Sequence, residues 1–472
     1  MTNLQRFGLR LAVVPVALVF AVAAAQAYRA PSAVDGYQEA LAIIAGAGLA
    51  AAALFVRPAW PFTAAIVLAA FNGHWDLLGA PFALDRLALV LAATSVLARE
   101  IAHRDGRLRT LPVHWLMALV ALYVFISAQF FGDLDADARV GLLDRIGVIP
   151  FLAFFLAPFV FRTERDRRVL LGGLVGLGAY LGLTALIEYT GPRDIIFPSY
   201  INDPNQGIHI DRSRGPFLEA GLNGTVLYAC AVAAAVAIAV WRDKRWRIFA
   251  ALVLGLCALG VLLTVTRAIW LAAVIASPLA LLAVPALRRY LIPAVAAGAV
   301  LVVAALAVVP GLERRSEERR DDDRPLWDRR NSNRAAVDML RDKPVLGFGW
   351  GRFEEDSTLY YRQSPDYPLT HVRDLHNTYL SNAVELGVVG AALWLLALLA
   401  GIGGAVLRRG PPELRPWKAG LIAVALSQAV ISATTPFDFV LPALLLWTWA
   451  GVAWGWRPGP GDGDQPGEPG RA

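Results

Sequence analysis

Long apolar runs follow one another along most of this chain, and they constrain its fold more than any other feature. Each run is long enough, at about 1.5 Å per helical residue, to cross roughly 30 Å of hydrocarbon. The composition agrees, because 57% of the 472 residues are hydrophobic and only 17% are charged, against about 25% charged in ordinary soluble domains. The chain is therefore predicted to be an all-α polytopic membrane protein.

Twelve of these runs are expected to cross the membrane as helices. They are residues 9–27, 40–56, 113–131, 146–161, 169–187, 217–240, 248–265, 268–287, 291–310, 378–407, 419–433 and 437–454. A weaker pair, 61–71 and 87–98, is expected to form two short or re-entrant helices, which gives 12–14 transmembrane helices. The first run also fits a cleavable signal peptide, although a retained anchor is more typical of such proteins.

Arginine and lysine gather in every second short loop, which predicts the orientation of the spans. The clusters are Arg99, Arg104, Arg107 and Arg109; Arg162, Arg165, Arg167 and Arg168; Arg242, Lys244, Arg245 and Arg247; Arg288 and Arg289; and Arg408, Arg409, Arg415 and Lys418. They alternate with poorer loops, so both termini are expected in the cytoplasm. The net charge of +6 then reflects membrane topology, and no nucleic-acid partner is expected.

These boundaries divide the chain into six parts. They are residues 1–189, N-terminal transmembrane helices; 190–216, a periplasmic loop; 217–310, further transmembrane helices; 311–377, a large periplasmic loop subdomain; 378–456, C-terminal transmembrane helices; and 457–472, a disordered cytoplasmic tail. The segment 311–377 is too long for a simple connector and is expected to carry structure or function of its own. An amphipathic helix is predicted there, from an N-cap at Ser332 to Arg341.

Neither a metal site nor a cofactor is expected. Cys230 and Cys257 lie inside apolar runs, so they support neither a disulfide nor a thiolate metal site. The acidic run 321–323 has no spaced partners to complete a metal shell, because three adjacent acids diverge on any regular element.

Arg267 is the clearest anomaly in the charge pattern. It is the only charge between residues 248 and 287, and the neighbouring basic loops place it at the external tip of a helix pair. A cation there contradicts the positive-inside trend and is costly without a partner. The two interpretations are an arginine that reaches the outer headgroups and an anion site that faces the external medium.

Arg214 repeats this anomaly in the other external loop. It precedes Pro216, which is placed to begin a helix near Phe217, and a helix N-terminus attracts anions. Arg214 and this helix end are therefore a second candidate phosphate clamp, with an ordinary loop arginine as the alternative. Glu219 and Asn223 lie just inside the same span, where polar residues are unusual, and Arg212 lies next to the clamp.

His376 is the candidate general base. Together with Asn377 it lies where the large external loop enters the span at Thr378, the N-terminal end of a helix. There the helix dipole disfavours the imidazolium, so a neutral imidazole is expected that can accept a proton. His371, His209 and Asp374 are rivals or orienting groups that the sequence cannot rank.

Two external arginines and a neutral histidine suit a diphosphate carried on a lipid. Arginine binds phosphate oxygens bidentately and can supply the charge neutralisation that Mg²⁺ provides elsewhere. The histidine would take the proton from an acceptor hydroxyl that attacks the carbon bearing the diphosphate. With a sugar donor, this single displacement inverts the anomeric centre.

Four motifs resemble the O-antigen ligase and polymerase superfamily. The run H-N-T-Y-L-S-N-A-V-E-L-G-V-V-G at 376–390 is similar to the family's His-Asn, nine residues, Gly-x-x-Gly signature. K-P-V-L-G-F-G-W-G-R-F at 343–353 resembles the segment before that histidine. T-R-A-I-W at 266–270 and S-R-G-P-F at 213–217 resemble the two external arginine motifs.

The resemblance implies a metal-independent, GT-C-like glycosyltransferase of the bacterial inner membrane. Its donor would be a glycan on undecaprenyl diphosphate at the periplasmic face, and its acceptor lipid A core in a ligase or a second carrier-linked repeat in a polymerase. The matched catalytic residues are His376, Arg267 and Arg214. Substrate contacts are expected from Arg212, Asn377, Glu219, Asn223, Arg334 and His371.

The modest first external loop favours a ligase, while the extra helix pair keeps a polymerase open. A lipid-linked glycan transporter is a weaker alternative, because its charged or broken spans would lie near the midplane. A metal-dependent GT-C enzyme would need acids in the first external loop, which offers only Asp35 and the nearby Glu39. A structural scaffold would have no use for Arg267.

Overall fold

The computed structural model describes residues 55–80, 83–102, 110–131, 141–144, 146–208, 210–309, 314, 324–362, 375–435 and 439–455. The expected first span, nearly all of the second and the tail 457–472 lie outside this part. So do His209, His371, Asp374 and the acidic run 321–323.

The described residues form helices and connecting turns, with no β-strand among them. The helices are α3 (Ala59–Leu68), α4 (Leu84–Ala102), α5 (Pro112–Phe130), α7 (Val148–Val160), α8 (Glu164–Thr190), α9 (Ala220–Val240), α10 (Lys244–Leu263), α11 (Arg267–Ala283), α12 (Leu291–Val308), α14 (Arg324–Asp342), α15 (Phe353–Asp356), α16 (Thr378–Leu398), α17 (Gly404–Leu407), α18 (Arg415–Ser432) and α19 (Val440–Trp454).

Seven helical stretches in the described part are long and apolar enough to cross a membrane. They are Pro112–Phe130, Gly141–Val160, Glu164–Thr190, Ala220–Val240, Lys244–Leu263, Pro285–Val308 and Thr378–Leu407. Three shorter apolar helices accompany them, Ala59–Phe71, Arg267–Ala283 and Val440–Trp454. This confirms the predicted class of an all-α polytopic membrane protein.

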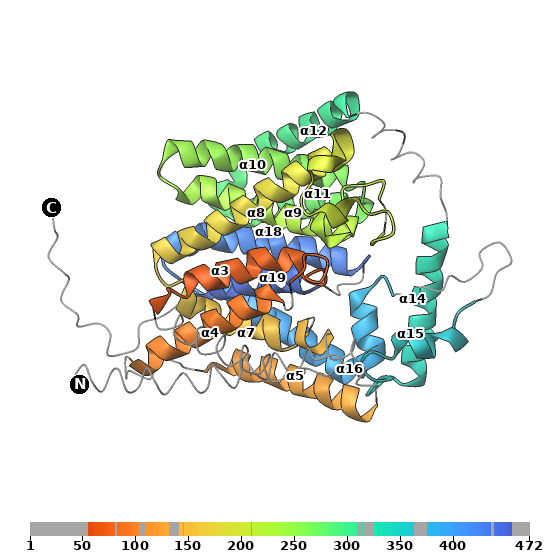
Figure 1. The fold of residues 1–472 in the computed structure, drawn as a ribbon. Helices are drawn as coiled ribbons and strands as arrows, with labels where there is room; N and C mark the ends of the chain where they lie inside the picture. The colour runs from red at the N-terminus through yellow and green to blue at the C-terminus, as the bar shows by residue number, and fades with distance from the viewer. Residues whose placement is uncertain are drawn as a thin grey trace.

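Helix α9 lies at the centre of the bundle and is buried along most of its length. It packs between α8 and α10, and also contacts α18 (Figure 1). Small residues make the close approach possible, since a Cβ at Gly178 would lie 2.9 Å from Cys230 Cβ and 2.9 Å from Cys257 Sγ. Both cysteines are free and buried, so here they serve packing.

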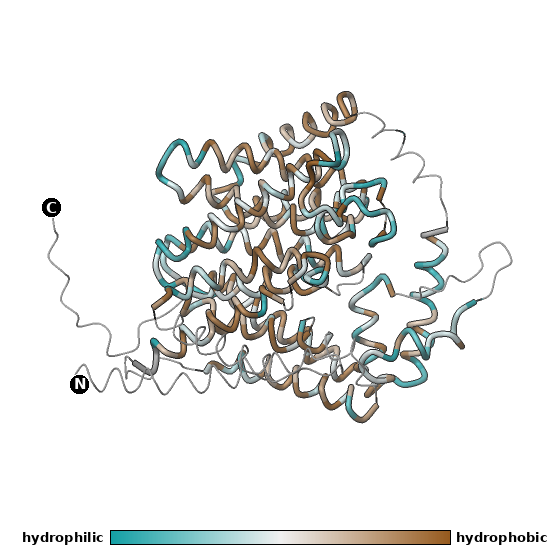
Figure 2. The backbone as a smooth tube through the Cα atoms, viewed as in Figure 1, coloured by the Kyte–Doolittle hydropathy of each residue, from teal (hydrophilic) through white to brown (hydrophobic). Residues whose placement is uncertain are grey.

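The bundle has two polar ends, which appear in teal on either side of the apolar helices in Figure 2. One end carries the turns 161–163, 241–243 and 408–414, and is called the basic end here. The other carries 191–219, 264–266, 375–377 and 433–435, and is called the site end. The turns at the basic end hold arginine and lysine clusters that the charge pattern places in the cytoplasm. The site end is therefore the expected external face.

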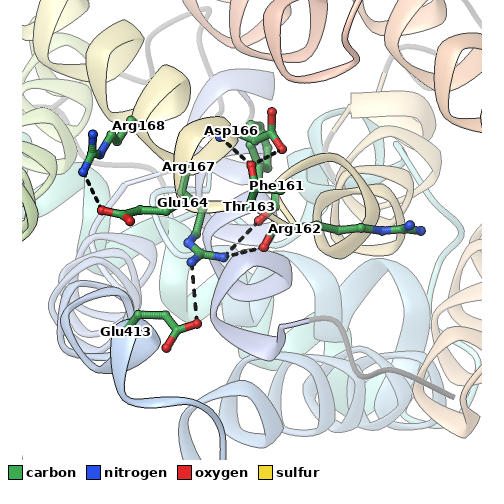
Figure 3. Close-up of polar contacts among 8 residues, drawn as sticks. All are labelled: Phe161, Arg162, Thr163, Glu164, Asp166, Arg167, Arg168 and Glu413. Carbon is green, nitrogen blue, oxygen red and sulfur yellow. Dashed lines mark hydrogen bonds and ion pairs between the residues drawn. The ribbon is translucent and has the colours of Figure 1, made fainter. Parts of the chain in front are cut away.

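At the basic end a buried arginine joins two turns. Arg167 donates to the carbonyls of Phe161 at 3.4 Å and Arg162 at 2.8 Å, and its guanidinium lies 3.9 Å from Glu413 (Figure 3). Thr163 caps α8 by accepting from the Asp166 N–H. This arginine therefore fixes the turn before α8 and brings it close to the turn before α18.

Beyond the site end, α14 and α15 belong to the segment 311–377, which is expected to be an external subdomain, and the described part of this segment is called the subdomain here (Figure 1). The prediction that this helix begins at Ser332 was wrong, because α14 already begins at Arg324. Pro325 does not prevent this, since proline is tolerated in the first turn of a helix. Ser332 lies inside the helix, where its hydroxyl donates to the Arg329 carbonyl at 3.2 Å.

The subdomain is attached to α16 by backbone hydrogen bonds at a kink. Gly387 has φ +67°, which opens the helix at this point. The N–H groups of Phe348 and Gly349 donate to the carbonyls of Val384 and Glu385, both at 2.9 Å, and Val388 N–H donates to the Pro344 carbonyl at 2.8 Å. The two sequence motifs 343–353 and 376–390 are thus one structural unit.

Gly387→Ala is expected to break this attachment. A Cβ there would lie 2.1 Å from the Val345 carbonyl oxygen, and the left-handed backbone alone costs roughly 1–3 kcal/mol in other residues. The midpoint of thermal unfolding in detergent should fall by several degrees. The matched control is Gly255→Ala in α10, which has nothing within 4 Å and should melt like the wild type. Equal midpoints for the two variants would contradict this account of the kink.

Candidate active site

Arg214 holds the loop 191–219 together at the site end. Its side chain is only 1% exposed, and its guanidinium donates to the carbonyls of Ile201 at 2.7 Å, Asp203 at 2.6 Å and Gln206. Its own backbone N–H donates to Glu188 Oε1 at 3.3 Å. The predicted phosphate ligand is therefore bonded to protein carbonyls in this structure, and direct contact with a diphosphate would require those bonds to be exchanged.

The segment around Arg214 is tied to the transmembrane helices. Ser213 donates from its N–H to the Leu263 carbonyl at 3.3 Å, and Asn223 Nδ2 donates to the Ser213 carbonyl at 3.0 Å. Asn223 is completely buried and Arg212 is 5% exposed. Arg212 Nε finds no hydrogen-bond acceptor in the described part of the chain. Asn223 thus acts as a structural tether here, and the substrate contacts expected of both residues stay predictions.

Helix α9 begins later than expected, and its N-terminal N–H groups are occupied. Pro216 belongs to a single 3₁₀ turn, Leu218 follows with φ +57°, and α9 begins at Ala220. The carboxylate of Glu219 accepts from the N–H groups of Gly221 at 2.9 Å and of Leu222. The expectation that Pro216 begins the helix was wrong, because an acidic side chain two residues after Phe217 caps it instead.

Arg267 differs from the buried Arg214 in its position and in the exposure of its side chain. It is the first residue of α11, at the tip of the α10–α11 pair, and its side chain is exposed. Helix α11 packs extensively on α18, so the tip lies beside the site end of α18. The predicted helix pair with an arginine at its tip is confirmed, and the contact of that arginine with a diphosphate stays a prediction.

His376 lies directly before α16, as the sequence predicted. Asn377 caps this helix, because its side chain accepts from the Leu380 N–H at 3.1 Å. Thr378 Oγ1 donates to the Thr435 carbonyl at 3.3 Å, which fastens the start of α16 to the turn after α18. His376 is partly exposed, and its charge acts on Glu219. The structure thus brings His376 and Glu219 together from residues far apart in the chain.

A small pocket opens beside this pair, between the site ends of α9, α18 and α19. Its lining residues are Glu219, Gly221, Leu222, Thr225, Ile431, Thr435, Phe439 and Pro442. Of these eight, Glu219 is the one ionisable side chain. Sequence reasoning missed Thr435 and Phe439, because an apolar span and its end carry no sign of a cavity. None of Arg214, Arg267 and His376 is among the lining residues, so the expected meeting of all three catalytic residues stays a prediction.

The remaining expected substrate contacts lie elsewhere. Arg334 is exposed on α14 and pairs with Asp338 at 3.7 Å, and its substrate contact stays a prediction. No group of three His, Cys, Asp or Glu residues that could hold a metal is found among the residues that the structure describes. The independence from metal ions therefore needs a solution test.

Arg214→Ala and Arg267→Ala are expected to separate a structural arginine from an exposed one. Loss of Arg214 leaves three carbonyls without a charged donor, at about 1.5–3 kcal/mol each, so the unfolding midpoint should fall by at least about 5 °C. Proteolysis should then cut the loop 199–206 more readily. Arg267→Ala should melt like the wild type. Equal midpoints for the two variants would contradict these assignments.

A comparison with protein-family models matches residues 252–395 to the family described as O-antigen ligase. The matched stretch includes the helix tip with Arg267, the external subdomain, His376 and the kink at Gly387. A search of curated proteins found no match. This match over residues 252–395 confirms the predicted resemblance to the superfamily of O-antigen ligases and polymerases.

Proposed function

We propose that this protein is a metal-independent inverting glycosyltransferase with a GT-C-like architecture. It transfers a glycan from an undecaprenyl-diphosphate carrier to lipid A core at the periplasmic face of the bacterial inner membrane. Its surroundings are membrane lipids, and it needs no cofactor. This is the activity of an O-antigen ligase.

The observation that carries the proposal is the position of Arg267. It is an exposed cation at the end of two apolar helices, on the face where the positive-inside trend disfavours cations. A guanidinium at that depth suits the diphosphate of a lipid whose tail lies in the bilayer, because arginine binds phosphate oxygens through two parallel hydrogen bonds. A structural scaffold gives no reason for an arginine at this tip.

In the proposed reaction, the acceptor hydroxyl oxygen attacks the anomeric carbon of the donor glycan. The bond from that carbon to the diphosphate oxygen breaks, and the diphosphate leaves with the bonding electron pair. His376 takes the hydroxyl proton, and Arg267 stabilises the charge that develops on the leaving group. A single displacement of this kind inverts the anomeric centre.

Two alternatives share parts of this site. An O-antigen or exopolysaccharide polymerase would use the same donor chemistry with a second carrier-linked repeat as acceptor, and the family match fits both. A lipid-linked glycan transporter would bind the same lipid without cleaving it. The acceptor requirement separates the first alternative from the ligase, and turnover separates the second.

A reconstituted reaction tests the proposal directly. Purified protein in liposomes receives a carrier-linked oligosaccharide, with and without lipid A core, in EDTA, and the products are resolved by gel and mass spectrometry. We expect transfer only when lipid A core is present, and its loss in His376→Ala. A product ladder without lipid A core would identify a polymerase. No wild-type product with a competent donor would contradict both enzymes.

Arg267→Ala should lower the transfer rate by about 10²–10³-fold, the usual effect of removing one donor from a developing negative charge. The thermal midpoint should not change, because the side chain is exposed. Arg267→Lys should recover only part of the rate, since an ammonium is a point charge without the planar fork. The matched control is Arg288→Ala near the basic end of α11, which should keep the full rate. A fully active Arg267→Ala would contradict the proposed role.

A further inference from the structure

Glu219 is a fixed carboxylate beside the candidate base. Its two oxygens accept from the N–H groups of Gly221 and Leu222, which locks the side chain against the first turn of α9. Each carboxylate oxygen has a second lone pair, so capping leaves room for another donor. The same side chain lines the small pocket. Because the Glu219 side chain is already held in one conformation, it loses little conformational entropy when another group binds to it.

The start of α16 lies against the opposite side of this pocket. Thr435 belongs to the pocket lining, and its carbonyl accepts from Thr378 Oγ1 at 3.3 Å. Asn377 fixes the first turn through its side chain, so residue 376 is held one position before a capped helix. Glu219 at the start of α9 therefore lines the pocket, and His376 lies two residues before Thr378, which is bonded to the pocket residue Thr435.

The electrostatic interaction of the two side chains supports this arrangement. Burial raises the pKa of Glu219, and the backbone N–H groups of Leu222 and Gly221 lower it. The charge of His376 lowers the pKa of Glu219 as well, so the ionised carboxylate and the imidazolium stabilise each other. A carboxylate beside an imidazole attracts positive charge on the ring, so Glu219 is placed to stabilise the charge that His376 would gain when it takes the acceptor's proton.

We propose that Glu219 is the positioning residue of the active site, which orients His376 and stabilises its imidazolium form during transfer. The inference rests on the proposed function, because it assigns a partner to the proposed base. Glu219 does not touch the reacting atoms in this scheme. It acts as a buried acid does toward the histidine of a hydrolase triad, by fixing the ring and its charge.

The kinetic test uses Glu219→Gln. The amide oxygen can still accept from one of the two N–H groups at the start of α9, so the unfolding midpoint should stay within a few degrees of the wild type, while the negative charge that acts on His376 is lost. We expect kcat to fall by roughly 10²-fold, the lower end of what a general base contributes, with KM for the donor within about threefold. A structural role alone would change stability rather than kcat.

The matched control is Asp243→Asn, at the opposite end of the helix bundle from Glu219. Asp243 caps α10 with its carboxylate, which accepts from the Arg245 N–H at 2.7 Å, but it lies at the basic end. The same carboxylate-to-amide change there should leave kcat unaltered. A full kcat for Glu219→Gln, or an equal loss in both variants, would overturn the proposal.

A cross-linking arm separates this inference from the proposed function. In membranes, the double variant Glu219→Cys with His376→Cys should be joined by a short bifunctional methanethiosulfonate, as detected by mass spectrometry. Asp243→Cys with His376→Cys should not be joined, because the length of α9 separates the two positions. No cross-link in the first pair would overturn the pairing. A cross-link in this pair, together with a wild-type protein that shows no transferase activity, would overturn only the proposed function.

Discussion

The attachment of the external subdomain to α16 is the interaction on which the rest of the site depends. A membrane helix normally uses all of its backbone groups internally, and an open turn is tolerated only where other protein groups satisfy it. Here Gly387 opens α16, and the segment 344–349 supplies the missing donors and acceptors. Gly347 allows the close approach, because a Cβ there would lie 2.5 Å from the Glu385 carbonyl oxygen. The large loop is thereby anchored a few turns below the residue that we propose as the base.

Arg214 and Arg267 have different surroundings in the structure. Arg214 is buried and organises its loop through hydrogen bonds from its guanidinium to backbone carbonyl groups. Arg267 projects from a helix tip and keeps its side chain exposed. Both positions follow the same sequence anomaly, a cation outside the basic loops. Only the hydrogen bonds distinguish the arginine that builds the site from the one available to a substrate.

The confirmed parts of the sequence prediction are those that local physics decides. Apolar length predicted the helices, and the charge-free stretch around Arg267 predicted two consecutive helices with the arginine at the turn between them, as α10 and α11 show. His376 and Asn377 were placed correctly before α16, because a capping residue and a following apolar run identify a helix start. The two errors, the starts of α14 and α9, both concern helix ends, where capping by a neighbouring side chain competes with proline and serine signals.

The sequence by itself determined the membrane class, the order of the helices, the two arginine anomalies and the helix start behind His376. Each of these depends on residues close together in the chain, so spacing and composition were sufficient. Only the tertiary structure decided that the motifs 343–353 and 376–390 form one unit, that Arg214 serves its own loop, and that Glu219 meets His376. Those outcomes depend on which backbone carbonyls and helix ends come together in space. Each of these contacts needs a particular arrangement of chain segments in space, whether the residues are near in the chain, as Arg214 and Asp203 are, or far apart, as Glu219 and His376 are, so no local pattern in the sequence encodes them.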